Sequence, residues 1–148
     1  MNFLIVIPAR GGSKGIPNKN IIDVCGKPLI QYTIDSSIKL KERQHVSRVI
    51  VSTDCQKIAN ISESLGAEIP FLRPESISTD NSKSIDSITH AILHFEELGF
   101  FYDAVVVLQP TSPLRQYEDL INALGLFIAN PCDGLISAYK EETINRLI

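Results

Sequence analysis

The sequence lacks several features that mark specialised classes of protein. It contains three cysteines, no tryptophan and one methionine in 148 residues, and no pair of cysteines has the CxxC spacing. A sparse, odd set of cysteines argues against both a disulfide framework and a zinc site. We therefore expect a cytoplasmic protein in which Cys25, Cys55 and Cys132 are buried or half-buried packing residues.

Long hydrophobic runs are also missing. The longest, residues 3–7 and 104–108, have five residues each, whereas a helix needs about 20 to cross a bilayer. No basic segment precedes the first run, and Pro8 and Arg10 follow it closely, so we expect no secretory signal. With 44% hydrophobic and 21% charged residues, the composition is typical of a globular protein that does not act in a membrane.

Charge is unevenly distributed about a net value of −3. Residues 10–27 carry four cationic side chains against the single acid Asp23, a local charge of +3, so the remaining residues sum to −6. A small basic region on an acidic chain favours a compact polyanion such as a nucleotide phosphate. The same distribution disfavours long nucleic acid, because most of the surface would repel it.

Short hydrophobic runs alternate with stretches of helical periodicity, which is typical of strands joined by crossover helices. The pattern predicts strands at 2–8, 47–53, 69–72, 103–109 and 133–139, and helices at 28–41, 55–65, 83–98 and 117–129. Strands that are hydrophobic throughout belong in a parallel sheet covered on both faces. The sequence therefore predicts one α/β, doubly wound domain over residues 1–148, with ligands at the carboxyl ends of its strands.

A basic, glycine-rich loop follows the first predicted strand. Residues 9–20 read ARGGSKGIPNKN, which has neither the Walker A spacing nor the GxGxxG pattern. Glycines that adopt positive φ can bring backbone N–H groups to phosphate oxygens, while arginine and lysine bind phosphate through their charge. The loop is therefore interpreted as a phosphate site for phosphoryl or nucleotidyl transfer, with a solvated surface turn as the alternative.

The loop and four later segments carry a family resemblance. Residues 7–20, IPARGGSKGIPNKN, resemble the amino-terminal signature of the acylneuraminate cytidylyltransferases, also called CMP-sialic acid synthetases. Similar segments follow in the same order: DVCGKPLI at 23–30, VSTD at 51–54, FLRPE at 71–75 and LQPTSPLR at 108–115. The resemblance implies a Rossmann-like nucleotide-diphospho-sugar transferase fold, with a mainly parallel sheet between helices, and covers the family's amino-terminal two-thirds.

The resemblance also implies roles for single residues in a reaction that joins CTP to a nine-carbon 2-keto sugar acid and releases pyrophosphate. Arg10 and Lys19 are expected as catalytic cations on the triphosphate, with Lys14 ranked below them. The expected nucleotide-binding residues are Arg10, Gly12, Ser13, Lys19, Asn20, Arg73, Asn81 and Lys83. The expected sugar-binding residues are Gln109, Thr111 and Ser112.

Helix capping offers a simpler role for several of these polar residues. Asp80 or Ser82 could cap the helix predicted at 83–98, because short polar side chains accept hydrogen bonds from the first N–H groups of a helix. Thr111 and Ser112 could cap the helix near residue 117 in the same way. For these segments the sequence leaves the binding and capping interpretations open.

No set of metal ligands is evident in the sequence. Nucleotidyl transfer generally uses Mg²⁺ held by carboxylates, yet no Asp-x-Asp occurs. The resemblance places the family's aspartate pair beyond Ile148, in a carboxyl-terminal part that also supplies homodimer contacts, so the chain is expected to be an incomplete domain. We expect Asp54 to cap the helix near Cys55, and His90 and His94 to lie on a solvated helix face rather than at a metal.

Two classes of function remain from the sequence alone. The leading hypothesis is a CTP-dependent cytidylyltransferase for an N-acylneuraminate-type sugar, used in surface polysaccharide biosynthesis. The alternative is a truncated, catalytically inactive nucleotide-binding module of the same lineage. A cytidylyltransferase of isoprenoid metabolism is a weaker third hypothesis, because that family's basic loop has a different pattern. The sequence does not choose among neuraminic, legionaminic and pseudaminic acids.

Overall fold

The computed structural model describes residues 1–148 apart from 13–14, 44–45, 80, 131 and 139–148. Its main sheet has three parallel strands in the order β4–β1–β5, namely β4 (Val46–Ser52), β1 (Phe3–Pro8) and β5 (Ala104–Val107). Beyond β4, the chain returns alongside it through isolated bridges at Glu68 and Leu72. The chain thus adds strands to one side of β1 and then to the other, which places the switch point of the sheet between β1 and β5.

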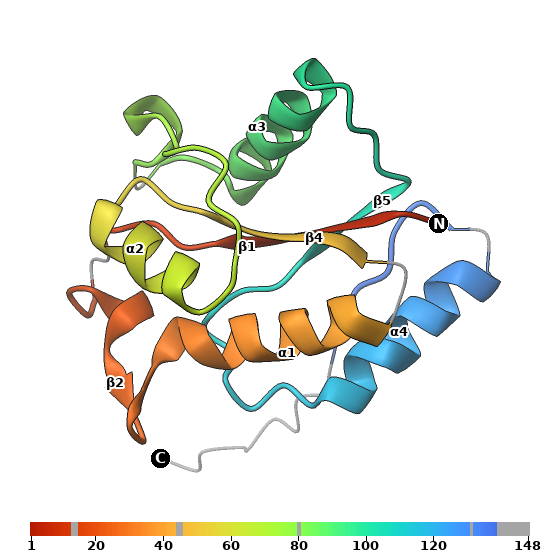
Figure 1. The fold of residues 1–148 in the computed structure, drawn as a ribbon, viewed down its shortest axis with the longest axis horizontal. Coiled ribbons are helices and arrows are strands. Elements are labelled where there is room, and N and C mark those ends of the chain that lie inside the picture. The colour runs from red at the N-terminus through yellow and green to blue at the C-terminus, as the bar shows by residue number, and fades with distance from the viewer. Residues whose placement is uncertain (13–14, 44–45, 80, 131, 139–148) are drawn as a thin grey trace, which may run out of the picture.

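Helices cover both faces of this sheet (Figure 1). On one face lie α1 (Leu29–Arg43), α2 (Gln56–Ser64) and α4 (Tyr117–Ala129), and on the other lies α3 (Ser84–Glu97). The predicted α/β fold with a parallel sheet between helices is therefore confirmed. The predicted helix bounds are correct to within two residues at every end.

The central strand β1 supplies side chains to two hydrophobic cores. Phe3, Ile5 and Ile7 pack into the larger core with α1, α2 and α4, while Leu4 and Val6 pack against α3. All five side chains are at most 1% exposed. Because successive side chains of a strand point to opposite faces, a strand buried on both faces must be hydrophobic at every position.

Two of the predicted strands are wrong. Residues 69–72 make only the single bridge at Leu72, because Pro70 has no N–H to donate to a ladder. Residues 133–138 form no strand and are exposed, since no described strand pairs with them; Tyr139 lies outside the described residues. The predictions at 2–8, 47–53 and 103–109 are correct, although β1 and β5 are shorter than predicted by one and three residues and β4 is shifted by one position.

The sequence did not predict a small hairpin and two short helical turns that the structure contains. The hairpin joins β2 (Asp23–Val24) to β3 (Lys27–Pro28). Cys25 and Gly26 form its tip with φ angles of 53° and 83°, which matches the positive φ at both central residues of a type I′ turn. The 3₁₀ turns are η1 (Lys19–Ile21) and η2 (Glu75–Ile77).

The expectation that all three cysteines are buried or half-buried is correct only for Cys55. Cys25 is exposed because it forms the hairpin tip, and Cys132 is exposed after the end of α4. In the part of the chain that the structure describes, no helix is long and apolar enough to span a membrane.

The buried ring of Phe95 anchors α3 to the sheet. It is 2% exposed and its centroid lies 5.7 Å from that of Tyr102. We predict that Phe95→Ala lowers the free energy of unfolding by about 3–5 kcal/mol, as cavity-forming substitutions do. Leu93→Ala on the exposed side of the same helix should change it by no more than about 0.5 kcal/mol. Urea titrations followed by circular dichroism measure both, and similar losses would contradict the placement of α3.

Candidate functional site

A pocket of about 270 Å³ opens at the carboxyl ends of β1 and β5. Three segments form its walls: the loop after β1, residues 73–84 with the start of α3, and residues 109–111 after β5. Four cationic side chains, those of Arg10, Lys19, Arg73 and Lys83, line it, and no described lining residue is acidic. A pocket of this charge favours a ligand with several negative charges.

The structure brings most of the predicted site residues together in this pocket. Those that line it are Arg10, Gly12, Lys19, Asn20, Arg73, Lys83, Gln109 and Thr111. Asn81 and Ser112 are exposed and are not among the lining residues. Ser13 and Lys14 lie outside the described residues.

Hydroxyl side chains from the third quarter of the chain also line the pocket, although the prediction selected only Arg73, Asn81 and Lys83 from residues 73–84. They are Ser78, Thr79, Ser82, Ser84 and Ser87. The density of serine and threonine between residues 76 and 87 was the available signal. Hydroxyls both donate and accept hydrogen bonds, so this wall can bind the polar edge of a base or a sugar.

The first loop is held against the turn after β4 by close packing at Gly11. A Cβ atom at Gly11 would lie 2.8 Å from the Cβ of Cys55, whereas Gly12 and Gly15 have open space around them. The described glycines with positive φ are Gly26, Gly66 and Gly99, none of them in this loop. The expected use of positive φ is therefore wrong: Gly11 is required here for close approach.

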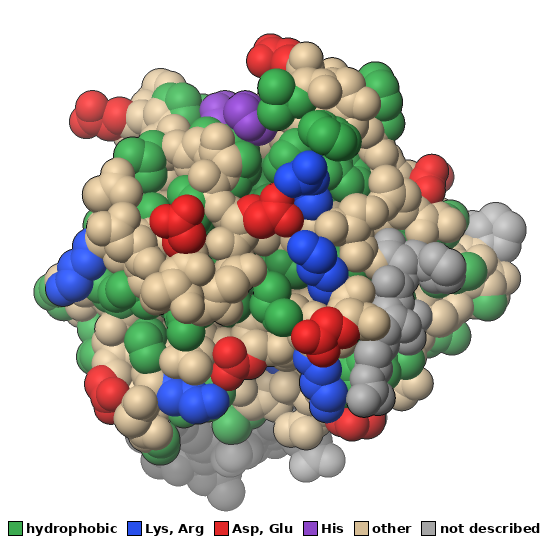
Figure 2. Space-filling view, in the orientation of Figure 1, with side chains coloured by type: hydrophobic (Ala, Val, Ile, Leu, Met, Phe, Trp, Pro, Cys, Tyr) green, Lys and Arg blue, Asp and Glu red, His purple; other side chains and the backbone are tan. Residues whose placement is uncertain are grey.

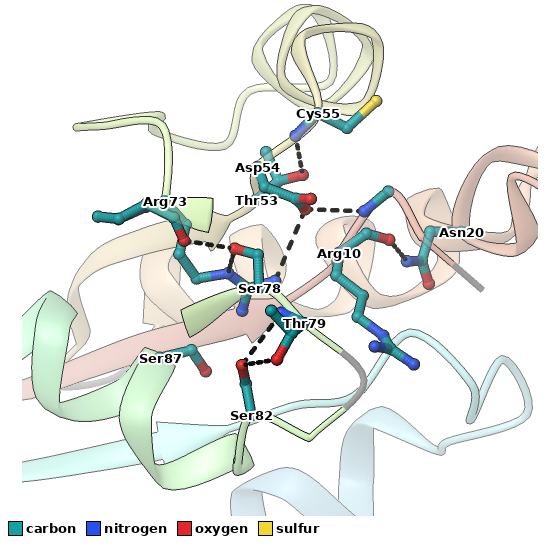
Figure 3. A network of polar contacts seen from close by, with 12 residues as sticks. Arg10, Asn20, Thr53, Asp54, Cys55, Arg73, Ser78, Thr79, Ser82 and Ser87 are labelled. Carbon is teal, nitrogen blue, oxygen red and sulfur yellow. Dashed lines mark hydrogen bonds and ion pairs between the residues drawn. The ribbon is translucent and has the colours of Figure 1, made fainter. Parts of the chain in front are cut away.

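Asn20 joins the two ends of the same loop. The residue is 7% exposed, and its Nδ2 donates a hydrogen bond of 3.0 Å to the carbonyl of Arg10. The guanidinium of Arg10 extends beside the segment that carries Thr79 and Ser82 (Figure 3). Asn20 thus fixes the main chain from which Arg10 reaches into the pocket.

Asp54 connects the loop after β1 to the wall formed by residues 73–84. Its Oδ1 accepts a hydrogen bond of 2.8 Å from the Gly11 N–H and lies 3.8 Å from a guanidinium nitrogen of Arg73. The predicted cap is wrong, because α2 has Cys55 as its N-cap with no side-chain hydrogen bond there. The Cys55 N–H instead donates to the hydroxyl of Thr53 at 3.1 Å.

Arg73 is a buried cation, with 7% of its surface exposed. Its Nε donates to the hydroxyl of Ser78 at 3.1 Å, and its backbone N–H donates to the carbonyl of Thr53 at 2.7 Å. Burial lowers the pKa of Arg73, the charge of Asp54 raises that pKa, and the charge of Arg10 lowers it. Arg10 and Arg73 thus contribute like charges to the lining of one pocket.

The capping alternatives for the polar segments are not observed among the described residues. Lys83 is the N-cap of α3, and its N–H donates to Asp86 at 2.9 Å, while Ser82 hydrogen-bonds to Thr79 instead. Gln116 is the N-cap of α4, so neither Thr111 nor Ser112 occupies that position. Asp80 lies outside the described residues.

Arg115, which the sequence analysis did not select, holds the loop after β5 against α1. Its guanidinium donates to the carbonyl of Gln109 at 3.0 Å and to the hydroxyl of Thr33 at 3.3 Å. Burial lowers the pKa of Arg115. The position of Gln109 in the pocket therefore depends on a residue six positions later.

The histidine pair of α3 lies partly buried rather than on a solvated face. The rings of His90 and His94 contact Phe71 with centroid distances of 4.4 Å and 5.0 Å. Phe71 lies over both rings because the chain passes α3 as it returns alongside β4. The buried face of α3 is therefore wider than its hydrophobic residues alone would make it. Burial lowers the pKa of His90, and the charges of His94 and Arg73 lower it further.

Metal-ligating side chains do not cluster in the part of the chain that the structure describes. No group of three or more His, Cys, Asp or Glu residues there could hold a metal ion. The carboxylate of Asp54 already binds Gly11 and pairs with Arg73. These residues therefore do not fit an Mg²⁺ site by themselves.

Charge on the surface around these elements is mixed. On the face shown in Figure 2, basic and acidic side chains are interspersed and no extended field of one sign is present. The pocket differs from this mixed surface because it brings four cationic side chains together.

Comparison with known proteins gives consistent similarities. Residues 4–132 match a family described as cytidylyltransferase. The chain is 40% identical over 124 residues to a CMP-N,N'-diacetyllegionaminic acid synthase of Legionella pneumophila. This match covers 84% of this chain and 52% of that protein. It is 39% identical over 125 residues to an N-acylneuraminate cytidylyltransferase of Escherichia coli, covering 84% of this chain and 28% of that one. The chain thus spans about half the length of these relatives or less.

The fold is similar to that of a solved CMP:2-keto-3-deoxy-manno-octonic acid synthetase complexed with CTP. The TM-score is 0.71 at 24% sequence identity, and the match covers 88% of this chain and 49% of the other. At this level of identity the likeness concerns the fold.

The contact between Gly11 and Cys55 generates a prediction for the first loop. Gly11→Ala should lower the free energy of unfolding by about 1–3 kcal/mol, because the new methyl group overpacks against Cys55. Gly12→Ala, which meets open space, is the matched control and should cost no more than about 0.5 kcal/mol. Adding Cys55→Gly should make Gly11→Ala less costly. If the two glycine variants lose equal stability in urea titrations, the proposed packing is refuted.

Proposed function

The chain belongs to the cytidylyltransferase family, and from this membership we propose that it is the nucleotide-binding part of a CMP-sugar synthetase for a sialic-acid-type sugar acid. The resemblance to acylneuraminate cytidylyltransferases that the sequence predicts is confirmed by the relatives. The observation that carries the proposal is the pocket with four cations and no described acidic lining residue. Such a pocket suits the triphosphate of CTP together with a carboxylate-bearing sugar.

The proposed roles follow the walls of the pocket. Arg10 and Lys19 bind the triphosphate, Arg10 through a planar guanidinium and Lys19 through a mobile ammonium group. The segment 73–84, with its hydroxyl side chains, binds the cytidine. Gln109 and Thr111, which follow β5 and line the same pocket, bind the hydroxyl groups of the sugar acid.

In the proposed reaction, the anomeric hydroxyl oxygen of the sugar acid attacks the α-phosphorus of CTP. The new P–O bond replaces the bond to the bridging oxygen, so pyrophosphate leaves with that electron pair and the hydroxyl proton passes to solvent. Negative charge increases on the phosphoryl oxygens and on the departing pyrophosphate. Cations fixed in place before the reaction stabilise this charge, and losing one such donor commonly costs about 3–4 kcal/mol of transition-state stabilisation.

We propose Mg²⁺ as the cofactor, with its protein ligands in sequence beyond Ile148. The described residues offer no set of ligands for it. When bound, Mg²⁺ would neutralise part of the phosphate charge. The proposed work of this chain's own residues is to bind the nucleotide and orient it towards the sugar.

The family's sugar acids differ, and the proposal is made for the class. One relative is named for a diacetyllegionaminic acid and another for N-acylneuraminate, at nearly equal identity to this chain. The residues that we assign to the sugar, Gln109 and Thr111, recognise hydroxyl groups in general. They do not distinguish one nine-carbon acid from another.

Pyrophosphate release tests the function. The chain is joined to the carboxyl-terminal segment of a longer relative, which would supply the Mg²⁺ ligands, and is incubated with CTP, Mg²⁺ and, in separate reactions, neuraminic, legionaminic and pseudaminic acids. Release with one of the acids supports the synthetase. Binding of CTP without release would favour the inactive nucleotide-binding module, and preferential binding of GTP in a competition among the four nucleoside triphosphates would contradict the cytidine assignment.

The two triphosphate cations give the sharpest prediction for binding. Arg10→Ala and Lys19→Ala should each weaken CTP binding about 10- to 150-fold, because hydrogen bonds to charged groups contribute about 1.5–3 kcal/mol each. Lys57→Ala, which removes an exposed cation of α2, is the control for net charge and should leave the affinity unchanged within about twofold. Isothermal titration measures all three. Equal losses in the three variants would mean that only net charge matters.

A further inference from the structure

We propose that Asp54 is a positioning residue for the nucleotide: one carboxylate oxygen sets the distance between the loop that holds the triphosphate and the wall that holds the cytidine. This inference rests on the proposed function. Asp54 is not among the residues that line the pocket. It therefore acts through the two neighbours that it binds, Gly11 and Arg73.

The geometry joins segments that are distant in sequence. Oδ1 of Asp54 accepts the Gly11 N–H at 2.8 Å and lies 3.8 Å from a nitrogen of Arg73, whose side chain is 5% exposed. In Figure 3, dashed lines join the Asp54 carboxylate to the backbone just after Arg10 and to the guanidinium of Arg73, which also contacts Ser78. A shift of this one carboxylate would move both walls of the pocket.

Each neighbour of Asp54 leads directly to residues that face the ligand. Gly11 stands between Arg10 and Gly12, which both line the pocket. Arg73 lines the pocket itself and binds Ser78, another lining residue. The triphosphate and the nucleoside are covalently joined, so CTP needs these two walls at one fixed separation.

The Asp54 carboxylate also balances the charge of Arg73. Arg10 and Arg73 both line the pocket, and the charge of Arg10 lowers the pKa of Arg73. Asp54 places a negative charge next to Arg73 without entering the pocket. The pocket thus keeps its positive lining for the ligand while the buried guanidinium has a partner.

A simpler role for Asp54 is not supported by its contacts. It does not cap α2, whose N-cap, Cys55, has its N–H bound by Thr53. The carboxylate contacts Gly11 in one wall of the pocket and Arg73 in another. Its position is therefore explained by the connection between those walls.

Isothermal titration of CTP tests the inference, with Asp54→Asn and Asp54→Ala compared with the wild type. Asn keeps an acceptor for Gly11 but loses the charge beside Arg73, whereas Ala loses both. We expect CTP affinity to fall at least about tenfold in Asp54→Ala, and by a smaller factor in Asp54→Asn, because small misplacements of binding groups are costly. Glu68→Gln, which breaks ion pairs with Arg48 and Lys41 near the start of β4, is the matched control. It should leave affinity unchanged.

Three outcomes would overturn the inference. Variants that bind CTP as the wild type does, but unfold at lower urea concentration, would show a merely structural role. A loss that is present with Mg²⁺ and absent in EDTA would show that Asp54 is a metal ligand instead. If the fold-losses of CTP affinity in Asp54→Asn and in Arg73→Met multiply in the double variant, the two residues act independently. A wild-type chain that binds no CTP would instead refute the proposed function, which keeps the two failures distinguishable.

Discussion

The burial of β1 on both faces is the constraint on which the rest of the structure depends. Each of its side chains from Phe3 to Ile7 enters one of two cores, so the strand must occupy the centre of the sheet. β4 and β5 then pair on either side of it. As a result, the loop that begins at Ala9 emerges at the switch point of the sheet, where the basic side chains that follow face a common pocket.

A pocket lined by four cations must be built without acidic side chains inside it. The structure meets this requirement because neutral and basic side chains, and one acid outside the lining, hold its loops. Asn20 and Arg115 donate to backbone carbonyls of the pocket loops, while Asp54 accepts a backbone N–H and pairs with a guanidinium nitrogen of Arg73. None of these contacts places a negative charge in the described lining, so the loops are fixed while the attraction for a polyanion is preserved.

Sequence periodicity predicted the helices and three of the strands because those patterns are local. The strands predicted at 69–72 and 133–139 failed for a different reason: a hydrophobic run becomes a strand only when a neighbouring backbone pairs with it. Pro70 removes one donor in the first case, and no described strand lies against residues 133–138 in the second. The hairpin tip at Cys25 and Gly26 lacks the common Asn-Gly signal, so its positive φ angles were not foreseen.

The cations of the site could be predicted from the sequence because they stand in a recognisable loop, whereas the contacts that position them join residues far apart. Asp54 and Gly11 are separated by 43 positions, and Arg115 and Thr33 by 82. One of these contacts was nevertheless within reach of sequence reasoning. β1 and β4 pair in parallel with Pro8 opposite Ser52, so residues two or three positions beyond each strand end emerge side by side. Once strand order is assigned, the carboxylate that follows β4 must meet the glycine that follows β1.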